Sequence, residues 1–587
     1  MTDKVCDYNF NIDLYSRQLG IIDSDSMTKL TSMKYLIIGL RGLGIEILKN
    51  LILEGPQRVD IYDPNYINIY DLNSNYFVTE EDINKIRDET IIEKIKDLNP
   101  YVKSDIIKQR ININEKKYEN ELEFILTKIK DYNMIILTEF ASKNTINKIN
   151  SECKKLNKGL IYSCALGLCG FLFNYFGKEH IITSPAEKND TFYPIKNIIK
   201  GEQTTIQLEN SLENFPYIIE DNFIKLSDLN GIKEINTDKI YKVVKRESFS
   251  EYKIDLNSSN FSDYTYGGFL QVITLPIKMN FRCFEEDIFK PLENKENDFM
   301  NIPYIGRNDI VHSLIISLYL RNYINNEAKN KNKRSYIINE DILPKIDDEK
   351  FQREILETAK NFYNDSKNKK ENWIQLEDIY DETSQQKEFD EKMASNLCLY
   401  LKNEIPPITS FLGGVVAQEA IKLTGRFTPF NQWFEFEFNY LSPKREKLGN
   451  NYQISKYTEQ IQIFGEETQK KLNSLKIFLI GVGAIGCEYL KNFAMMGISN
   501  KEGVLTITDF DKIEISNLNR QFLFRENNIN QYKSEVAGNY IKQMNDSINI
   551  LAYKNYVGIE TENIFTDQFW DEQDIIFNAV DNVKARF

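Results

Sequence analysis

The stretch Asp509-Phe-Asp-Lys-Ile-Glu-Ile-Ser-Asn-Leu-Asn-Arg-Gln-Phe522 decides the fold class of this 587-residue chain. It begins where an apolar run, residues 504–508, predicts the end of a buried strand. An earlier apolar run, 477–480, leads into the glycine-rich turn Gly481-Val-Gly-Ala-Ile-Gly486, and apolar residues then recur at helical spacing. Strand, tight turn and helix in this order predict a Rossmann-like α/β unit whose turn cradles phosphate.

Polar residues after the second strand distinguish this unit from a dehydrogenase. Asp509 stands where a dinucleotide fold holds an acid against ribose hydroxyls. Hydride transfer has no need of a second acid, Asp511, or of the cations Arg520 and Lys533 that follow. Arginine and lysine neutralise charge on phosphates, and carboxylates hold magnesium ions. The pattern therefore favours a nucleoside triphosphate.

A later apolar run, 574–580, brings Asp581 and Asn582 to the same sheet edge. We predict that Asp511 and Asp581 hold Mg²⁺ and that Arg520 and Lys533 are catalytic cations. The predicted ATP-binding residues are Gly481, Gly483, Ala484, Asp509, Asn517, Arg520, Gln521, Lys533, Asp581 and Asn582. The alternative is a solvated charged surface, the usual fate of charged residues, but polar groups crowded at strand ends beside a phosphate loop favour a site.

The chain contains this unit twice, as copy one from residue 14 and copy two from residue 456. Tyr15 precedes Gly39 by the same interval along the chain as Tyr457 precedes Gly481. Downstream, Asp71-Leu-Asn in copy one answers Asn517-Leu-Asn in copy two. A fold class of two Rossmann-like units follows from this repeat.

The two copies differ at the predicted site residues. Copy one has Asn65 for Asp511, Ser74 for Arg520, Asn75 for Gln521 and, with 135–136 aligned to 575–576, Ala141 for Asp581. Arg41 replaces Gly483, the glycine that lets a phosphate approach the turn. Copy one nevertheless keeps Arg17 where copy two has Glu459. We therefore predict that the copies pack face to face and that Arg17 is a catalytic arginine finger for the nucleotide of copy two.

With these motifs the chain resembles ubiquitin-activating enzymes of the single-chain type, in which an inactive adenylation unit of the ThiF/MoeB-like kind precedes an active one. Residues 260–264 and 267–268 resemble the family's exit from its first inserted half-domain, and residues 406–419 resemble the helix that returns to the inactive unit. The resemblance implies ATP and Mg²⁺ as cofactors and adenylation of the C-terminal carboxylate of ubiquitin. It also implies transfer to ubiquitin-conjugating enzymes, a cytoplasmic and nuclear location, and a monomer with an internal pseudo-dimer.

Three alternatives stay open at this point. The chain could activate another ubiquitin-like modifier, or it could bind a modifier without catalysis. An NAD-dependent dehydrogenase would explain the glycine turn and Asp509, but it leaves Arg520, Lys533 and the degenerate repeat without a purpose.

The expected domains follow the resemblance. We predict the inactive adenylation unit at 1–177 and 401–448, an inserted β half-domain at 178–270, a four-helix bundle at 271–400, and the N-terminal part of the active unit at 449–587. In the family, the rest of the active unit and the domain with the thioester-forming cysteine come later in the chain. We therefore expect no thioester cysteine among these residues. Cys487 begins a helix, where thiol pKa values fall, but a packing role is predicted for it.

Composition limits the remaining possibilities. A net charge of -14 argues against a nucleic-acid surface. Residues 1–13 lack the apolar region of a signal peptide, and the apolar stretch 161–177 predicts two buried strands instead of a membrane span. The 7 cysteines at irregular spacing predict free thiols in a reducing compartment, and the presence of only 2 histidines argues against histidine-based catalysis.

Overall fold

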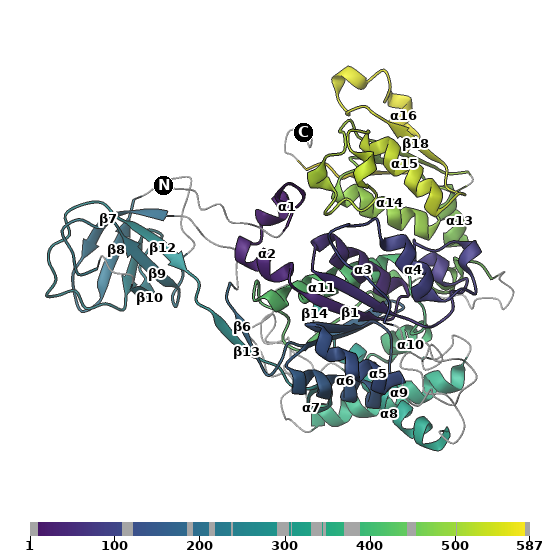
Figure 1. Cartoon of the computed structure of the whole chain (residues 1–587), viewed down its shortest axis with the longest axis horizontal. Helices are drawn as coiled ribbons and strands as arrows, with labels where there is room; N and C mark the ends of the chain where they lie inside the picture. Colours follow the sequence, from purple (N-terminus) through teal and green to yellow (C-terminus); the bar gives the residue numbers. More distant parts are fainter. Residues whose placement is uncertain are drawn as a thin grey trace. The chain divides into compact units, whose positions relative to one another are not determined.

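The computed structural model describes residues 10–107, 121–184, 192–209, 218–235, 239–289, 305–306, 308–329, 343, 348–368, 388–442, 454–500 and 502–581. The chain divides into two compact units (Figure 1). Unit 1 comprises Met1–Glu179, Asn280–Leu423 and Phe430–Phe587, and unit 2 comprises His180–Met279 and Thr424–Pro429. Both copies of the repeat belong to unit 1.

Copy one is built on a seven-stranded sheet in the order β14-β15-β5-β4-β3-β1-β2. Its strands are β1 (Lys34–Ile38), β2 (Arg58–Tyr62), β3 (Met134–Leu137), β4 (Gly159–Leu166), β5 (Cys169–Tyr175), β14 (Ile305–Gly306) and β15 (Trp433–Glu437). Strands β2, β1, β3 and β4 run parallel, and β5, β15 and β14 continue the sheet in antiparallel pairs. Every residue of β4 and β5 is buried, which confirms the two buried strands predicted at 161–177.

Seven helices accompany this sheet among the described residues. They are α1 (Ile12–Leu19), α2 (Ser24–Leu30), α3 (Gly42–Glu54), α4 (Arg87–Ile95), α5 (Glu121–Lys128), α6 (Lys143–Leu156) and α11 (Pro406–Ile421). Helix α3 starts at the glycine turn after β1 and ends at Gly55, whose φ of 85° terminates the helix in the left-handed region. Helix α11 packs along α3, so the chain returns to copy one after the inserted segments.

Copy two has the same central parallel strands as copy one. Its four-stranded parallel sheet has the order β18-β17-β16-β19, with β16 (Lys476–Ile480), β17 (Val504–Thr508), β18 (Ile550–Tyr553) and β19 (Ile575–Asn578). Its helices are α12 (Thr458–Phe464), α13 (Glu466–Ser474), α14 (Ala484–Met496), α15 (Lys533–Met544) and α16 (Asp567–Asp571). Strand β16 lies between β17 and β19 as β1 lies between β2 and β3, which confirms the internal repeat.

Strand register corrects one predicted correspondence between the copies. Tyr35 pairs with Met134 in copy one, and its counterpart Ile477 pairs with Ile575 in copy two. Asp581 therefore corresponds to Phe140 and not to Ala141. Two consecutive isoleucines in each strand allowed an alignment that was wrong by one residue, and in a strand such a shift moves each side chain to the opposite face. Phe140 is buried, so copy one still lacks the predicted metal ligand.

The segment between β5 and α11 contains helices α7 (Phe284–Asp287), α8 (Asp309–Lys329), α9 (Glu349–Asn368) and α10 (Glu391–Leu399). Helices α8, α9 and α10 pack against one another within the segment for which a helical bundle is predicted. In the described part of this segment the fourth helix, α7, is only a single turn. The four-helix bundle and the boundaries 271–400 stay predictions.

Unit 2 is a closed barrel in the order β10-β11-β8-β7-β12-β9. Its strands are β7 (Phe192–Ile199), β8 (Thr204–Leu208), β9 (Phe223–Ser227), β10 (Ile240–Arg246), β11 (Glu251–Ile254) and β12 (Phe269–Ile273), and β6 (Glu179–Ile182) pairs with β13 (Ile277–Asn280). Inward-facing residues such as Ile206, Ile224, Val243 and Leu270 form its core. The α/β class with two Rossmann-like units and an inserted β domain is therefore confirmed.

None of the helices in the described ranges combines the length and hydrophobicity that a bilayer span needs.

Candidate nucleotide site

The glycine turn of copy two joins β16 to α14 and leaves space above the helix N-terminus. Gly481 has a φ of 95°, and a Cβ there would come within 2.8 Å of the Ala579 carbonyl oxygen. A Cβ at Gly486 would lie 2.3 Å from the Gly481 carbonyl oxygen. These two glycines are needed for the turn itself. Gly483 differs, because the nearest atom to its added Cβ is Gln521 Nε2 at 4.0 Å. At Gly483 the backbone is therefore open to a ligand.

Asp509 holds this turn in place. One carboxylate oxygen accepts a hydrogen bond from the Val482 N–H at 2.7 Å, and the other accepts one from the Asp511 N–H at 2.8 Å. Burial raises the pKa of Asp509, while these hydrogen bonds and the charge of Lys533 oppose the rise. Asp63 makes the same pair of bonds in copy one, to Leu40 at 2.8 Å and Asn65 at 3.0 Å. Fixing the loop is thus a role that this acid has in both copies, beside the predicted contact with ribose.

Three cations lie around the open loop. Lys533 begins α15, and its ammonium group donates to Asp511 Oδ2 at 2.8 Å. Arg520 follows the short helix η8 (Ile515–Asn517), against which α1 packs and brings Arg17 close. Burial and the positive charge of Arg17 lower the pKa of Arg520, and Asp581 partly offsets this. Among the described residues neither guanidinium forms an ion pair, so two like charges share a region that suits an anion.

The amide side chains predicted for this site have different surroundings. Asn517 is buried, and its Oδ1 accepts from the Glu514 backbone N–H at 3.0 Å, which shapes the turn. Gln521 is also buried, but its Oε1 has no hydrogen-bond partner in the described structure. A buried oxygen without a partner is costly unless a ligand satisfies it. Gln521 therefore fits a nucleotide contact, and Asn517 has a structural role already.

The predicted metal ligands are less enclosed. Asp511 is about half exposed, with 51% of its side chain accessible, and Asp581 follows the end of β19 at an exposed position. No group of three or more metal-ligating side chains occurs within the described ranges. Asn582 lies outside the described residues. The magnesium assignment stays a prediction, and these two acids could contribute only part of a coordination shell.

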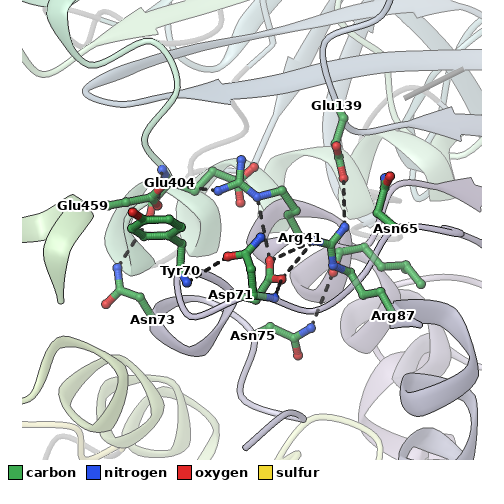
Figure 2. A network of polar contacts seen from close by, with 12 residues as sticks. Arg41, Asn65, Tyr70, Asp71, Asn73, Asn75, Arg87, Glu139, Glu404 and Glu459 are labelled. Atoms are coloured by element: carbon green, nitrogen blue, oxygen red, sulfur yellow. Dashed lines mark hydrogen bonds and ion pairs between the residues drawn. The ribbon is translucent and has the colours of Figure 1, made fainter. Parts of the chain in front are cut away.

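The corresponding site of copy one is filled by its own side chains (Figure 2). Arg87 is fully buried and donates to Asp63 at 2.8 Å and to Asp71 at 2.9 Å. Arg41, which replaces Gly483, points across the loop, with 3.8 Å between its Nε and Asp71. We call this cluster, together with Glu404 and Glu459, the closed site.

Arg87 was missed in the sequence. It begins α4 as Lys533 begins α15, and its backbone N–H donates to Asn65 as that of Lys533 donates to Asp511. The spacing gives the signal, because Arg87 follows Asp63 at the same interval along the chain as Lys533 follows Asp509. Copy one has therefore kept one cation of the site and neutralised it with its own carboxylates.

Two further carboxylates complete the closed site. Glu404 is buried beside the first turn of α3, where an open site would receive a phosphate, and its Oε2 would lie 2.9 Å from a Cβ added at Gly42. Glu459 of copy two accepts from Arg41 Nη2 at 3.3 Å and from the Glu404 backbone N–H at 3.0 Å. Burial raises the pKa of Glu459 to about 7, against the opposing charge of Arg41, and burial also raises that of Glu404. Protein carboxylates and a guanidinium thus lie against the loop that is open in copy two.

The two copies meet through a charge cluster that has two-fold symmetry. Lys49 of α3 pairs with Glu488 of α14 at 2.5 Å, and its counterpart Lys491 pairs with Glu46, the counterpart of Glu488. Both lysines are buried. Although burial opposes it, Lys491 and Lys49 lower the pKa of Glu488. This reciprocal pairing confirms that the copies pack against each other.

A tandem of Rossmann-like units, one with an open glycine loop and one whose loop is closed by its own ion pairs, defines a pseudo-dimer within a single chain. The chain belongs to the ThiF family, whose sequence profile matches residues 15–451 and 457–587. This agrees with the predicted adenylation units.

The chain is similar to ubiquitin-activating enzymes over nearly its whole length, which confirms the predicted resemblance. It is 31% identical over 98% of its residues to ubiquitin-like modifier-activating enzyme 1 of Dictyostelium discoideum, of which it covers 52%. Identity is 30% with the human protein of the same name, over 98% of this chain and 50% of that protein. It is also 30% with ubiquitin-activating enzyme E1 2 of Arabidopsis thaliana, over 98% of this chain and 49% of that protein. The chain thus spans about half the length of these relatives.

A solved structure, E. coli MccB with AMPCPP and MccA, is similar over 27% of this chain and 44% of that chain, at 21% identity. Its TM-score of 0.23 is too low to carry an argument.

Proposed function

We propose that copy two binds ATP with Mg²⁺ and adenylates the C-terminal carboxylate of ubiquitin, as the names of the relatives suggest. One observation carries this proposal. The same loop is open at Gly483 in copy two and filled by Arg41 in copy one. Around the open loop, Arg520, Lys533 and Arg17 supply positive charge for phosphates.

The internal symmetry supports the role of Arg17 as an arginine finger. Glu459 is the counterpart of Arg17, and Arg41 is the counterpart of Gly483. Glu459 lies 3.3 Å from Arg41, so this position of one copy reaches the glycine turn of the other copy. The same relation directs Arg17 toward Gly483 and the phosphates that the open loop would hold.

The chemistry that we propose requires no general base. A carboxylate at a protein C-terminus is ionised at neutral pH, so its oxygen can attack the α-phosphorus directly. The bond from this phosphorus to the bridging oxygen of the β-phosphate breaks, and pyrophosphate leaves. Arg17, Arg520 and Lys533 offset the charge on the phosphates, and the Gly483 turn orients them.

The residues present fit both cofactors. The open Gly483 backbone and the unsatisfied Oε1 of Gln521 suit ATP. Asp511 and Asp581 would hold the magnesium ion, which supplies further neutralisation of phosphate charge. Lys533 donates to Asp511, and its ammonium group would be free to turn to a phosphate if Asp511 bound the metal.

Further parts of the proposal concern the surroundings of the enzyme. We propose ubiquitin as the protein substrate, ubiquitin-conjugating enzymes as later partners, and action in the cytoplasm and nucleus. The domain limits 1–177, 178–270, 271–400, 401–448 and 449–587 are part of the same proposal.

Calorimetric titration of the 587-residue chain with magnesium and ATP tests the site. Wild type should bind ATP and not NAD, and Asp581→Ala should weaken ATP binding in magnesium while leaving binding in EDTA unchanged. The matched control is Asp574→Ala, because Asp574 lies at the other end of the same strand and accepts from the Lys476 N–H at 2.8 Å. Binding of NAD without ATP would overturn the proposed function. Equal effects of the two substitutions would refute the metal role of Asp581.

A further inference from the structure

Gln18 lies in the last turn of α1, next to Arg17, and its side chain bridges the two copies. Its Nε2 donates to the Glu54 carboxylate at 2.8 Å and to the Glu54 carbonyl oxygen at 3.1 Å. Glu54 is the last residue of α3, the helix that begins at the closed site. Gln18 therefore fixes the end of α1 to the end of a long, buried helix of copy one.

The other end of the Gln18 amide points to copy two. Its Oε1 accepts from Asn519 Nδ2 at 3.5 Å, a long hydrogen bond, and Asn519 Oδ1 accepts from Arg520 Nη1 at 3.1 Å. Asn519 is buried, so its amide has few other orientations available. A continuous polar path thus runs from Glu54 in copy one, through Gln18 and Asn519, to the Arg520 guanidinium.

The internal repeat separates the structural part of this arrangement from the rest. Gln460 is the counterpart of Gln18, and its Nε2 donates to the Met496 carbonyl oxygen at 3.0 Å, as Gln18 does to that of Glu54. The bond from the glutamine to the end of the neighbouring helix is therefore common to both copies. The hydrogen bond from the glutamine Oε1 to the other copy is not common to both, because Gln460 Oε1 is buried without a partner in the described structure.

The counterpart of Asn519 also differs. Asn73 donates at 3.5 Å to the Glu404 carbonyl oxygen in the closed site and not to Gln460. The path through the glutamine and the asparagine therefore exists only on the side of the open site, where the predicted catalytic arginines lie. Gln460 instead donates to Gln469 Oε1 at 2.6 Å, within copy two.

We propose that Gln18 is a positioning residue for the open site, which orients Arg520 through Asn519 and fixes the end of α1 that carries Arg17. This inference rests on the proposed function. Among the described residues, Arg520 has one other anchor, the Ser516 carbonyl oxygen that accepts from Nη1. The bond to Ser516 holds the Arg520 guanidinium near its own backbone. The hydrogen bonds through Asn519 and Gln18 connect the guanidinium to copy one, and Gln18 is next to Arg17 in α1. Two like charges stay together only when the structure holds them there.

The test compares Gln18→Met with the matched control Gln460→Met in the full 587-residue chain. Both variants keep side-chain volume and lose the bond to the helix end. ATP and AMP affinities are measured by calorimetry in magnesium. The proposal places the two arginines at the β- and γ-phosphates, which AMP lacks, so Gln18→Met should bind ATP about tenfold more weakly, equivalent to about 1.4 kcal/mol. Its AMP affinity should stay within about twofold of wild type, and Gln460→Met should keep the wild-type ratio of the two affinities.

A second measurement needs no nucleotide. The rate at which phenylglyoxal modifies Arg520, followed by mass spectrometry, should rise severalfold in Gln18→Met and in Asn519→Ala, but not in Gln460→Met. Asn519→Ala breaks the same path from the other side, so it replaces Gln18→Met if that variant does not fold. The double variant should react no faster than the faster single variant, because both changes interrupt one path.

The outcomes separate the inference from the function on which it rests. Three results would overturn the positioning role without affecting the proposal that the chain binds ATP. Gln18→Met could lose ATP and AMP affinity equally, it could keep the wild-type affinities, or Gln460→Met could change the affinities by as much as Gln18→Met does. If wild type binds no ATP, the proposed function fails, and the Arg520 modification rates then decide. The positioning role is supported if phenylglyoxal modifies Arg520 faster in Gln18→Met but not in Gln460→Met. It is refuted if Arg520 is modified at the same rate in both variants.

Discussion

Replacing Arg87 with methionine should be among the most destabilising single changes in copy one. The guanidinium is fully buried and lies 2.8 Å from Asp63 and 2.9 Å from Asp71, whose side chains are also inaccessible to solvent. Arg87→Met leaves two buried carboxylates without their shared counter-charge. Removing one partner of a buried ion pair costs about 3–5 kcal/mol, and here one residue serves two pairs. The loss is a large part of the stability of an ordinary domain, which is about 5–15 kcal/mol.

Urea unfolding of the 587-residue chain, followed by far-UV circular dichroism, measures this loss. Arg87→Lys introduces the residue that copy two has at Lys533, so it keeps the charge and should lose clearly less than Arg87→Met. Adding Asp71→Asn, the residue of copy two at Asn517, should make the lysine variant more stable, because one ammonium group then faces one carboxylate.

Two results would refute this reasoning. A loss below about 1 kcal/mol for Arg87→Met would show that the closed site is not a buried ion network. A double variant no more stable than Arg87→Lys alone would show that Asp71 does not depend on the charge at position 87.

Three further predictions concern the pseudo-dimer. In a protein extended to the length of the relatives, Arg17→Ala should slow ubiquitin-dependent exchange of pyrophosphate into ATP by about 10³ or more. The control Glu459→Ala should change the exchange rate little. Comparable slowing in both variants would contradict the arginine-finger role of Arg17. Burial raises the pKa of Glu54 from 4.5 to about 7. Between these two pH values the folded chain holds a proton on Glu54 that the unfolded chain has released. The contribution of this proton to stability is therefore present at low pH and is lost as the pH rises toward 7. Glu54→Gln should therefore gain stability over wild type between about pH 5 and pH 8, by on the order of 3 kcal/mol in urea unfolding, and a difference that is constant with pH would show that Glu54 does not titrate there. Finally, the chain incubated with ubiquitin and magnesium ATP should give no reducible ubiquitin adduct on a gel. Burial raises the pKa of all six described cysteines, which makes them poor nucleophiles. A reducible adduct that disappears in Cys487→Ala would disprove this prediction.

Much of the fold follows from local patterns. The glycine turns, the strand patterns and the repeat spacing predict two Rossmann-like units, and the structure has them at Gly39 and Gly481. The open loop was predictable in part, because a glycine at position 483 brings no side chain of its own into the turn, whereas the absence of neighbouring atoms around it is a property of the fold. Such features depend on backbone conformation, which the local sequence largely controls.

The closed site could not be predicted in the same way. Its ion pairs join residues far apart in the chain, such as Arg41 with Glu459, and no local pattern indicates that these side chains meet. Arg87 was overlooked because an arginine at a helix start is ordinarily solvated. The alignment of Asp581 with Ala141 was wrong because only strand pairing fixes register.

The paired charges Lys49–Glu488 and Lys491–Glu46 have a consequence for how independently the two copies can change. A pairing in which residue i of one unit meets residue j of the other, and j meets i, is the pattern that two identical subunits make about a two-fold axis. In such a dimer one mutation alters both halves at once, so neither site can change alone. Once both units are encoded in a single chain, each site can change independently. The two lysine pairs keep the reciprocal pattern, and the difference between Gly483 and Arg41 breaks it.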